Sequence, residues 1–164
     1  MKKDKSNIKI LVAYHRPFDL LKSNILTPIH VGRDIATNTE SKSWLEKNML
    51  GDNMGDNISY KNKNYCELTA LYWAWKNLDS DYLGLFHYRR MMSFKDSISQ
   101  IYSTDKKFLK KIGLDDNTIE KMCKKYDVIL PPVYNVHPIG QPKNIMSNYE
   151  FYANEHNKSD MDAM

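Results

Sequence analysis

The chain has 164 residues, 41% of them hydrophobic and 12% aromatic, so it is too apolar to be an intrinsically disordered protein. This length suits one packed domain rather than two. The 24 Lys and Arg against 20 Asp and Glu leave a net charge of +4, which is too small to indicate a dedicated nucleic-acid binder, and no apolar stretch approaches the roughly 20 residues that span a bilayer.

The N-terminal part of the sequence predicts a flexible, polar start at 1–7 and then a buried strand at 8–14. That apolar run is too short for a secretion signal, and no small-residue cleavage site follows it. A second short strand is predicted over 27–32. Cys66 and Cys123 have no second cysteine or histidine at metal-binding spacing, which suits a reducing compartment, so we expect a cytoplasmic protein.

The strongest predicted helix covers 65–77. Asn64 and Glu67 have the three-residue spacing of a capping-box variant at its start. Apolar side chains lie on nearly all its sides, which predicts a buried helix with both Trp73 and Trp75 in the core. The other predicted elements are a short helix around 43–50, a buried strand over 82–86, helices over 105–112 and 118–125, a strand over 127–130, and a helical stretch around 148–156.

Alternation of strands and helices predicts an α/β domain with a mostly parallel sheet flanked by helices. Ligands of such sheets bind outside the carboxyl ends of the strands. Only four of the 24 basic residues are arginine, and all four follow predicted strands; they are Arg16, Arg33, Arg89 and Arg90. A guanidinium group pairs with two oxygens at once, so this rim of the sheet suits a phosphorylated ligand such as a diphosphate.

Aromatic and glycine patterns refine this prediction. Tyr14 and Tyr88 stand at strand ends, where they are candidates to stack on a base or a sugar. The sequence contains neither GxxxxGK[ST] nor GxGxxG, which argues against a P-loop NTPase or a Rossmann dehydrogenase.

Each candidate residue also has a purely structural interpretation. Arginines at strand ends also form salt bridges at sheet edges. Asp56 and Asn57 are of the types that form turns, and their Gly-Asp-Asn context lacks the oxygen ligands of a calcium loop. His15 and His87 are candidates for metal ligands, but a single histidine at a strand end more often forms hydrogen bonds within a loop.

Five segments together carry a family resemblance. They are ILVAYHRPF at 10–18, PIHVGR at 28–33, GDNIS at 55–59 followed by Asn62, YCELTALYWAWKN at 65–77 and DYLGLFHYRR at 81–90. In this order they resemble a bacterial family catalogued as a domain of unknown function and numbered 4422, over roughly residues 8–135. Members occur among capsular polysaccharide, exopolysaccharide and O-antigen synthesis proteins, and are regarded as glycosyltransferases or glycosyltransferase-like.

The resemblance implies a GT-A-like, Rossmann-like fold in which residues 8–135 form the half that binds a nucleotide sugar. It implies transfer of a sugar from a nucleoside diphosphate, which we expect to be UDP, to a surface-polysaccharide or lipid-linked glycan acceptor. The residues expected to bind the nucleotide sugar are Ala13, Tyr14, His15, Arg16, Arg33, Asp56, Asn57, Asn62, His87 and Tyr88.

The sequence departs from many GT-A enzymes at the metal-binding Asp-x-Asp motif, because His87-Tyr88-Arg89-Arg90 stands in the corresponding place. A departing diphosphate needs positive charge, which arginines supply without a metal. We therefore expect Arg89 or Arg90, assisted by Arg16, to clamp the diphosphate, and no cofactor to be required. The alternative is Mn²⁺ or Mg²⁺ with His87 as a ligand.

The family's domain normally continues beyond the position equivalent to Met164. Residues 136–164 are therefore expected to begin the acceptor-side region and the chain to lack its acceptor half, so no catalytic base is assigned. A cytoplasmic enzyme with peripheral contact to the inner membrane face is expected, with no nucleic-acid partner. The alternatives are a catalytically inactive module that binds a nucleotide sugar or glycan, and an interaction domain without a ligand.

Overall fold

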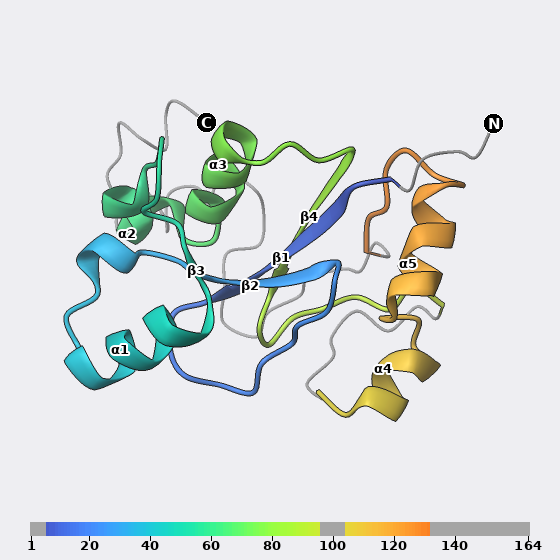
Figure 1. The fold of residues 1–164 in the computed structure, drawn as a ribbon, viewed down its shortest axis with the longest axis horizontal. Coiled ribbons are helices and arrows are strands. Elements are labelled where there is room, and N and C mark those ends of the chain that lie inside the picture. The colour runs from blue at the N-terminus through green and yellow to red at the C-terminus, as the bar shows by residue number, and fades with distance from the viewer. Residues whose placement is uncertain (1–5, 96–103, 132–164) are drawn as a thin grey trace, which may run out of the picture. The chain divides into compact units, whose positions relative to one another are not determined.

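A computed structural model describes residues 6–95 and 104–131 (Figure 1). The chain divides into two units after residue 132, and every described residue lies in the first. The strands are β1 (Ile8–Tyr14), β2 (Leu26–His30), β3 (Leu50–Gly51) and β4 (Tyr82–His87). They form one sheet in the order β3-β2-β1-β4, and every neighbouring pair is parallel. The predicted α/β fold with a parallel sheet is confirmed.

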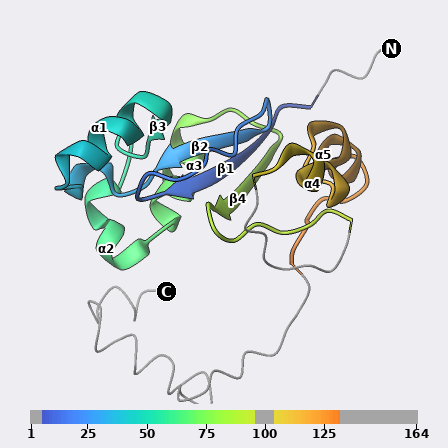
Figure 2. The ribbon, with the colours of Figure 1, turned by 90° about the horizontal axis from the view of Figure 1, so that it is seen from below.

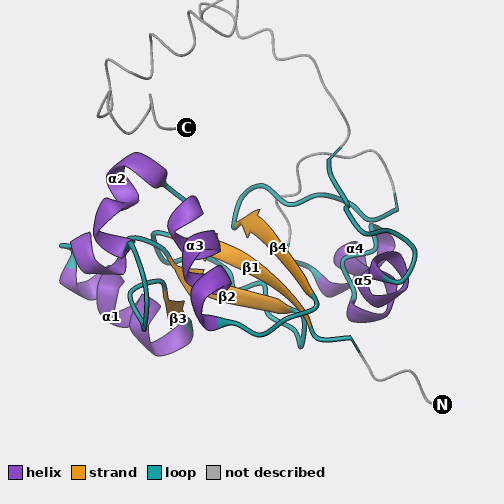
Figure 3. Cartoon of the chain, turned by 90° about the horizontal axis from the view of Figure 1, so that it is seen from above, coloured by secondary structure: helices purple, strands orange, loops and turns teal. Residues whose placement is uncertain are grey.

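Helices cover both faces of this sheet. They are η1 (Arg33–Ile35), α1 (Thr39–Asn48), η2 (Ser59–Lys61), α2 (Asn62–Tyr65), α3 (Leu68–Asn77), α4 (Lys106–Lys111) and α5 (Asp116–Cys123). Figure 3 shows α3 lying across one face of the sheet. In Figure 2, α4 and α5 lie side by side, well apart from α1.

The central strand β1 is apolar along its length because its two faces enter two different hydrophobic clusters. Leu11 and Ala13 pack with Ala70 and Trp73 of α3. The alternate residues of β1, which include Val12, belong to a larger cluster with side chains from α1, α4 and α5. This is why the run of apolar residues at 8–14 correctly predicts a strand.

The predicted helix over 65–77 is wrong at its start and in its burial. Cys66 has a φ of 47° and separates α2 from α3, so Glu67, not Asn64, is the N-cap residue of α3. The helix is buried on one side only. Trp73 is 5% exposed, whereas Trp75 is 68% exposed and does not belong to the core.

Other boundaries also differ from the sequence predictions. The first helix, α1, begins earlier than expected, and residues 50 and 51 form the unpredicted strand β3 instead of a helix end. The strand predicted over 127–130 is absent, and Val128 and Leu130 are 72% and 76% exposed. The helical stretch predicted around 148–156 lies outside the described residues, as do positions 1–5 and 132–164.

β4 forms one edge of the described sheet and is less buried than predicted. Phe86 is its one buried residue, and Leu83 is 38% exposed. A cavity of about 440 Å³ lies beside it, lined by Tyr82–Phe86 of β4 and by residues 126–131 among others. In the described part of the chain, no helix is long and apolar enough to cross a membrane.

Candidate functional site

The candidate site lies where β1 and β4 end side by side. These two strands are parallel neighbours, with Ala13 paired with His87. The ladder continues one residue further, because the Tyr88 N–H donates to the Ala13 carbonyl oxygen at 3.0 Å. Residues 15–16 and residues 88–90 therefore leave the same edge of the sheet together.

Tyr88 stands at the centre of an aromatic cluster. Its ring stacks on Tyr14 with centroids 5.3 Å apart, and its other ring contacts are with His15 at 5.4 Å, Phe18 at 5.1 Å and His87 at 4.4 Å. Tyr14 and Tyr88 are both buried, so neither ring has a face open to a base or sugar, contrary to the stacking role considered for them. His15 and Phe18 are the exposed rings of the cluster.

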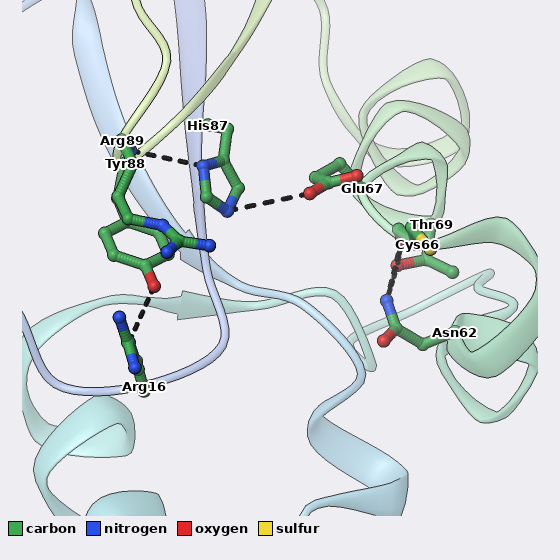
Figure 4. A network of polar contacts seen from close by, with 8 residues as sticks. All are labelled: Arg16, Asn62, Cys66, Glu67, Thr69, His87, Tyr88 and Arg89. Atoms are coloured by element: carbon green, nitrogen blue, oxygen red, sulfur yellow. Dashed lines mark hydrogen bonds and ion pairs between the residues drawn. The ribbon is translucent and has the colours of Figure 1, made fainter. Parts of the chain in front are cut away.

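Two arginines contact the Tyr88 side chain, as Figure 4 shows. The Arg16 Nε–H donates to the Tyr88 hydroxyl oxygen at 2.7 Å. The Arg16 and Arg89 guanidinium carbons lie 5.8 Å and 5.2 Å from the centroid of the Tyr88 ring. Both arginines are exposed, and no carboxylate in the described residues forms an ion pair with either. The guanidinium groups of Arg16 and Arg89 thus both face solvent, and both lie against the buried Tyr88 side chain.

His87 connects this arginine pair to α3. Its Nδ1 accepts a hydrogen bond from the Arg89 backbone N–H at 3.2 Å, so the ring proton is on Nε2. Nε2 faces Glu67 Oε1 at 3.6 Å, an electrostatic contact longer than a normal hydrogen bond. Figure 4 shows Glu67 on one side of His87 and Arg89 on the other.

The pKa values of both histidines of the site lie below the usual value for histidine. The partial desolvation of the His15 ring by its aromatic neighbours lowers its pKa below the usual 6.5, and the positive charges of Arg16 and Arg89 lower it further. Burial also lowers the pKa of His87, where Glu67 acts in the opposite direction. Their ring centroids are 6.0 Å apart.

Arg90, the other member of the adjacent pair, takes a different position. Its backbone forms a bridge with His87, since the Arg90 N–H donates to the His87 carbonyl oxygen at 2.8 Å and the Arg90 carbonyl oxygen accepts in return at 3.2 Å. This tight turn closes the end of β4, and the Arg90 side chain is exposed. Arg89, whose guanidinium group lies over Tyr88, is therefore the better placed of the pair for a clamp with Arg16.

Arg33 follows the carboxyl end of β2, but its guanidinium group is used within the sheet. Its terminal Nη2 donates to the carbonyl oxygens of Met49 and Leu50 at 3.0 and 2.9 Å, and Nε donates to His30 Nδ1 at 3.3 Å. It lies against Gly51, where a Cβ would come within 2.6 Å of Arg33 Nε. Arg33 thus ties β2 to β3.

Asp56 and Asn57 lie in the loop before η2, where Asp56 contacts α3 and Asn57 contacts its own loop. The Asp56 carboxylate accepts from the Tyr72 hydroxyl at 3.2 Å, and the Asp56 N–H donates to Asn77 Oδ1 at 3.2 Å. Asn57 closes its own loop by accepting from the Ser59 N–H at 3.1 Å. In the described part of the chain, neither side chain forms a hydrogen bond or ring contact with the Tyr88 cluster.

Asn62 fixes the break between α2 and α3. Its amide Nδ2 donates to the Cys66 carbonyl oxygen at 2.7 Å and to Thr69 Oγ1 at 3.1 Å. The side chain also lies against Gly32, whose φ is 66°. Asn62 therefore positions Glu67 through the backbone, without lying in the Tyr88 cluster.

Two carboxylates that the sequence analysis did not select prove important. Glu67 was considered only for helix capping. Asp52 is fully buried and accepts hydrogen bonds from Gly32 N at 2.7 Å, Arg33 N at 3.1 Å, Ser59 Oγ at 2.5 Å and Thr69 Oγ1 at 2.6 Å. It joins the end of β2 to the start of α3. Its place after a glycine was the available sequence clue, but that clue equally fits a turn.

The structure brings together Ala13, Tyr14, His15, Arg16, His87, Tyr88 and Arg89 of the predicted site residues. Arg33, Asp56, Asn57 and Asn62 lie elsewhere, in the structural roles just given. No group of three or more His, Cys, Asp or Glu side chains in the described part of the chain is arranged to hold a metal ion. That the chain requires no metal stays a prediction.

Comparisons with known proteins show which family and which solved structure the chain is similar to. A family model described as "Domain of unknown function (DUF4422)" matches residues 9–164. The chain is also similar to the apo structure of WbbM, a bifunctional glycosyltransferase, at 38% sequence identity and a TM-score of 0.59. That match covers 70% of this chain and 21% of the WbbM chain, so the chain spans about a fifth of that protein. No curated protein matches the chain.

Proposed function

Since the chain belongs to the DUF4422 family, we propose that it is a glycosyltransferase, or the donor-binding portion of one, that uses a nucleoside diphosphate sugar. The similarity to a bifunctional glycosyltransferase supports this general class of enzyme. The single observation that carries the proposal is the arginine pair, Arg16 and Arg89, held over Tyr88 at the ends of β1 and β4.

The chemistry of transfer explains why such a pair is useful. The bond between the anomeric carbon and the diphosphate oxygen breaks, and the oxygen leaves with the electron pair, so negative charge grows on the diphosphate. The acceptor hydroxyl oxygen forms the new bond and gives up its proton. Arg16 and Arg89 offer planar, permanently charged donors to the departing diphosphate. No residue is assigned to take the acceptor proton.

The remaining parts of the donor are assigned to the same rim. His15, which is exposed just after β1, is proposed to contact the nucleotide base and ribose, whereas Ala13 is fully buried and only supports this end of the strand. UDP is the proposed nucleotide, and a surface-polysaccharide or lipid-linked glycan the proposed acceptor. We place the reaction in the cytoplasm, with peripheral contact to the inner membrane face.

Nucleotide binding by the 164-residue chain tests the proposal directly. Titration calorimetry with UDP, UMP, GDP and CDP is expected to show a nucleoside diphosphate binding more tightly than its monophosphate. Arg16→Ala and Arg89→Ala are each expected to weaken UDP binding about 10-fold or more, because a charge-assisted hydrogen bond contributes roughly 1.5–3 kcal/mol.

The matched control is Lys47→Ala, which removes a positive charge from the last turn of α1 and is expected to leave UDP affinity unchanged. If both arginine variants bind UDP within about twofold of the wild type, the clamp is wrong. Release of free UDP from a UDP-sugar then separates an enzyme from the alternative, an inactive module that binds the donor without turnover.

A further inference from the structure

The Glu67 carboxylate is an unexpected acidic group beside the arginine pair. We propose that Glu67 binds the donor by accepting hydrogen bonds from a vicinal diol, with His87 as its positioning residue. This inference rests on the proposed function, and adds to it a group that recognises hydroxyls. Ribose and the transferred sugar both carry such diols, and the experiment below tells them apart.

The backbone places Glu67 at this rim. It is the N-cap residue of α3, immediately after the break at Cys66, where φ is 47°. The Asn62 amide donates to the Cys66 carbonyl oxygen, and Asp52 accepts from Thr69 in the first turn of α3. These contacts turn the start of α3 toward the carboxyl ends of β1 and β4, so the position of Glu67 is set by buried, well-bonded neighbours.

His87 orients the carboxylate without using up its acceptors. Because His87 Nδ1 is occupied by the Arg89 N–H, the Nε2–H is the group that faces Glu67. The 3.6 Å separation leaves both carboxylate oxygens able to accept other hydrogen bonds. The Glu67 side chain is 41% exposed and the His87 side chain 12% exposed, so a ligand reaches the carboxylate while the imidazole stays fixed.

The charge pattern matches a molecule with an anionic centre and hydroxyls beside it. Arg16 and Arg89 lie on one side of His87, and Glu67 lies on the other (Figure 4). A carboxylate has only acceptor oxygens and repels a phosphate, so its partner here must donate. Two adjacent hydroxyls, one for each carboxylate oxygen, are neutral donors that a nucleotide sugar provides.

The decisive variant is Glu67→Gln, which keeps the size of the side chain but replaces one acceptor oxygen by a donor. Calorimetry with UDP, 2′-deoxy-UDP, UDP-glucose and UDP-galactose measures its effect. If the ribose diol is the partner, the variant binds UDP about 10-fold more weakly and 2′-deoxy-UDP nearly as the wild type does. If the sugar is the partner, UDP binding is kept and binding of a UDP-sugar falls about 10-fold.

The controls separate recognition from folding. Glu40→Gln makes the same change at an exposed position in the first turn of α1, and is expected to leave every affinity within twofold of the wild type. Glu67→Asp keeps the charge but shortens the side chain, and an intermediate loss is expected. His87→Phe is expected to weaken binding 3–10-fold, and His87→Gln, which retains an N–H donor, to recover at least half of that loss.

Two failures are distinguishable. Glu67→Gln affinities within twofold of the wild type for all four ligands would overturn the role of Glu67, while the arginine variants still test the proposed function. If the wild type binds no nucleoside diphosphate, both proposals fall together. If Glu67→Gln weakens all four ligands equally, with a lower melting temperature, Glu67 has a structural role and the inference is wrong.

Discussion

Arg16 donates a 2.7 Å hydrogen bond from Nε to the Tyr88 hydroxyl oxygen, so the chain after β1 is fixed to the chain after β4, 72 residues later. Tyr88 is 2% exposed, and its ring packs against four other aromatic rings. The guanidinium group is thus oriented by a buried side chain before any ligand arrives. Less side-chain entropy is then lost on binding than for a free surface arginine.

Tyr88→Phe tests this orientation, because it keeps the stacked ring and removes only the hydroxyl. UDP affinity is expected to fall 3–10-fold, and the free energy of unfolding by about 1 kcal/mol, the net value of one hydrogen bond. Calorimetry and urea denaturation measure the two effects. Tyr60→Phe, at a residue that is 61% exposed, is the control expected to change neither. An unchanged UDP affinity in Tyr88→Phe would show that Arg16 does not need its hydrogen bond to the Tyr88 hydroxyl in order to bind UDP.

Asp52→Asn is expected to be among the most destabilising conservative changes in the chain. The buried carboxylate accepts from two N–H groups and two hydroxyls, and an amide nitrogen in place of one oxygen leaves buried donors facing a donor. A loss of about 2–4 kcal/mol in the free energy of unfolding is expected from urea denaturation. Asp34→Asn is the matched control, since Asp34 is exposed, and a loss below about 1 kcal/mol is expected there.

His30 is expected to make stability depend on pH. It is buried, and burial together with the Arg33 charge lowers its pKa from 6.5 to about 4. Below pH 6.5 the unfolded chain binds a proton that the folded chain does not, so stability falls as the pH drops toward 4. Between pH 7.5 and 5 this amounts to about 2 kcal/mol.

The measurement compares urea denaturation of the wild type and His30→Asn at the two pH values. Asn keeps an acceptor for the Arg33 Nε–H but does not titrate. His15 and His87 are present in both proteins. Any difference between the two proteins in how the free energy of unfolding changes with pH therefore comes from His30. Equal losses in both proteins would contradict the prediction. The charges of Asp52, Glu46 and Lys42 act on His30 in both directions and are smaller than the effect of burial.

Gly32→Ala is expected to lower the free energy of unfolding by more than the strain of a left-handed alanine backbone alone. Gly32 has a φ of 66°, and a Cβ there would come within 2.6 Å of Asn62 Oδ1. The left-handed conformation costs about 1 kcal/mol, and the clash adds to it. In the Asn62→Gly background all three clashing side-chain atoms of Asn62 are absent, so Gly32→Ala should then cost only the backbone part. Additive effects in this double-mutant cycle would rule out the clash.

Replacement of Trp73 and of Trp75 by alanine is expected to lower the free energy of unfolding by very different amounts. Trp73 is buried and donates from Nε1 to the Met54 carbonyl oxygen at 2.7 Å, so Trp73→Ala should cost about 3–5 kcal/mol. Trp75 is 68% exposed, with Lys76 Nζ 3.6 Å from its ring centroid, so Trp75→Ala should cost less than about 1 kcal/mol. Denaturation curves of the two variants are the test, and similar losses would contradict it.

The parallel sheet can be predicted from the sequence because the pattern that indicates it, a short apolar run, is local. An apolar run such as 8–14 fits a strand covered on both faces, and such strands end at a common edge. The break at Cys66 is not predictable in this way. No glycine or proline marks it, and it depends on Asn62 and on the bond from Thr69 to the distant Asp52. The run at 127–130 has strand-forming residues, but a strand also requires a hydrogen-bonded neighbour.

The same distinction holds for the candidate site. Arg16 and Arg89 are found from sequence, because each follows a predicted strand and the carboxyl ends of parallel strands share one rim of the sheet. Arg33 has the same sequence context, yet its guanidinium group bonds to carbonyl oxygens beside β3. Glu67 was missed because its role depends on a tertiary neighbour, His87, and not on its own helix.

The two edges of the sheet are chemically unequal. The β3 edge has only two residues, Leu50 and Gly51, so it offers few backbone groups to a further strand. The β4 edge has six residues, a partly exposed Leu83 and an apolar cavity alongside. In the described part of the sheet, an added strand would therefore gain more backbone hydrogen bonds and cover more apolar surface beside β4 than beside β3.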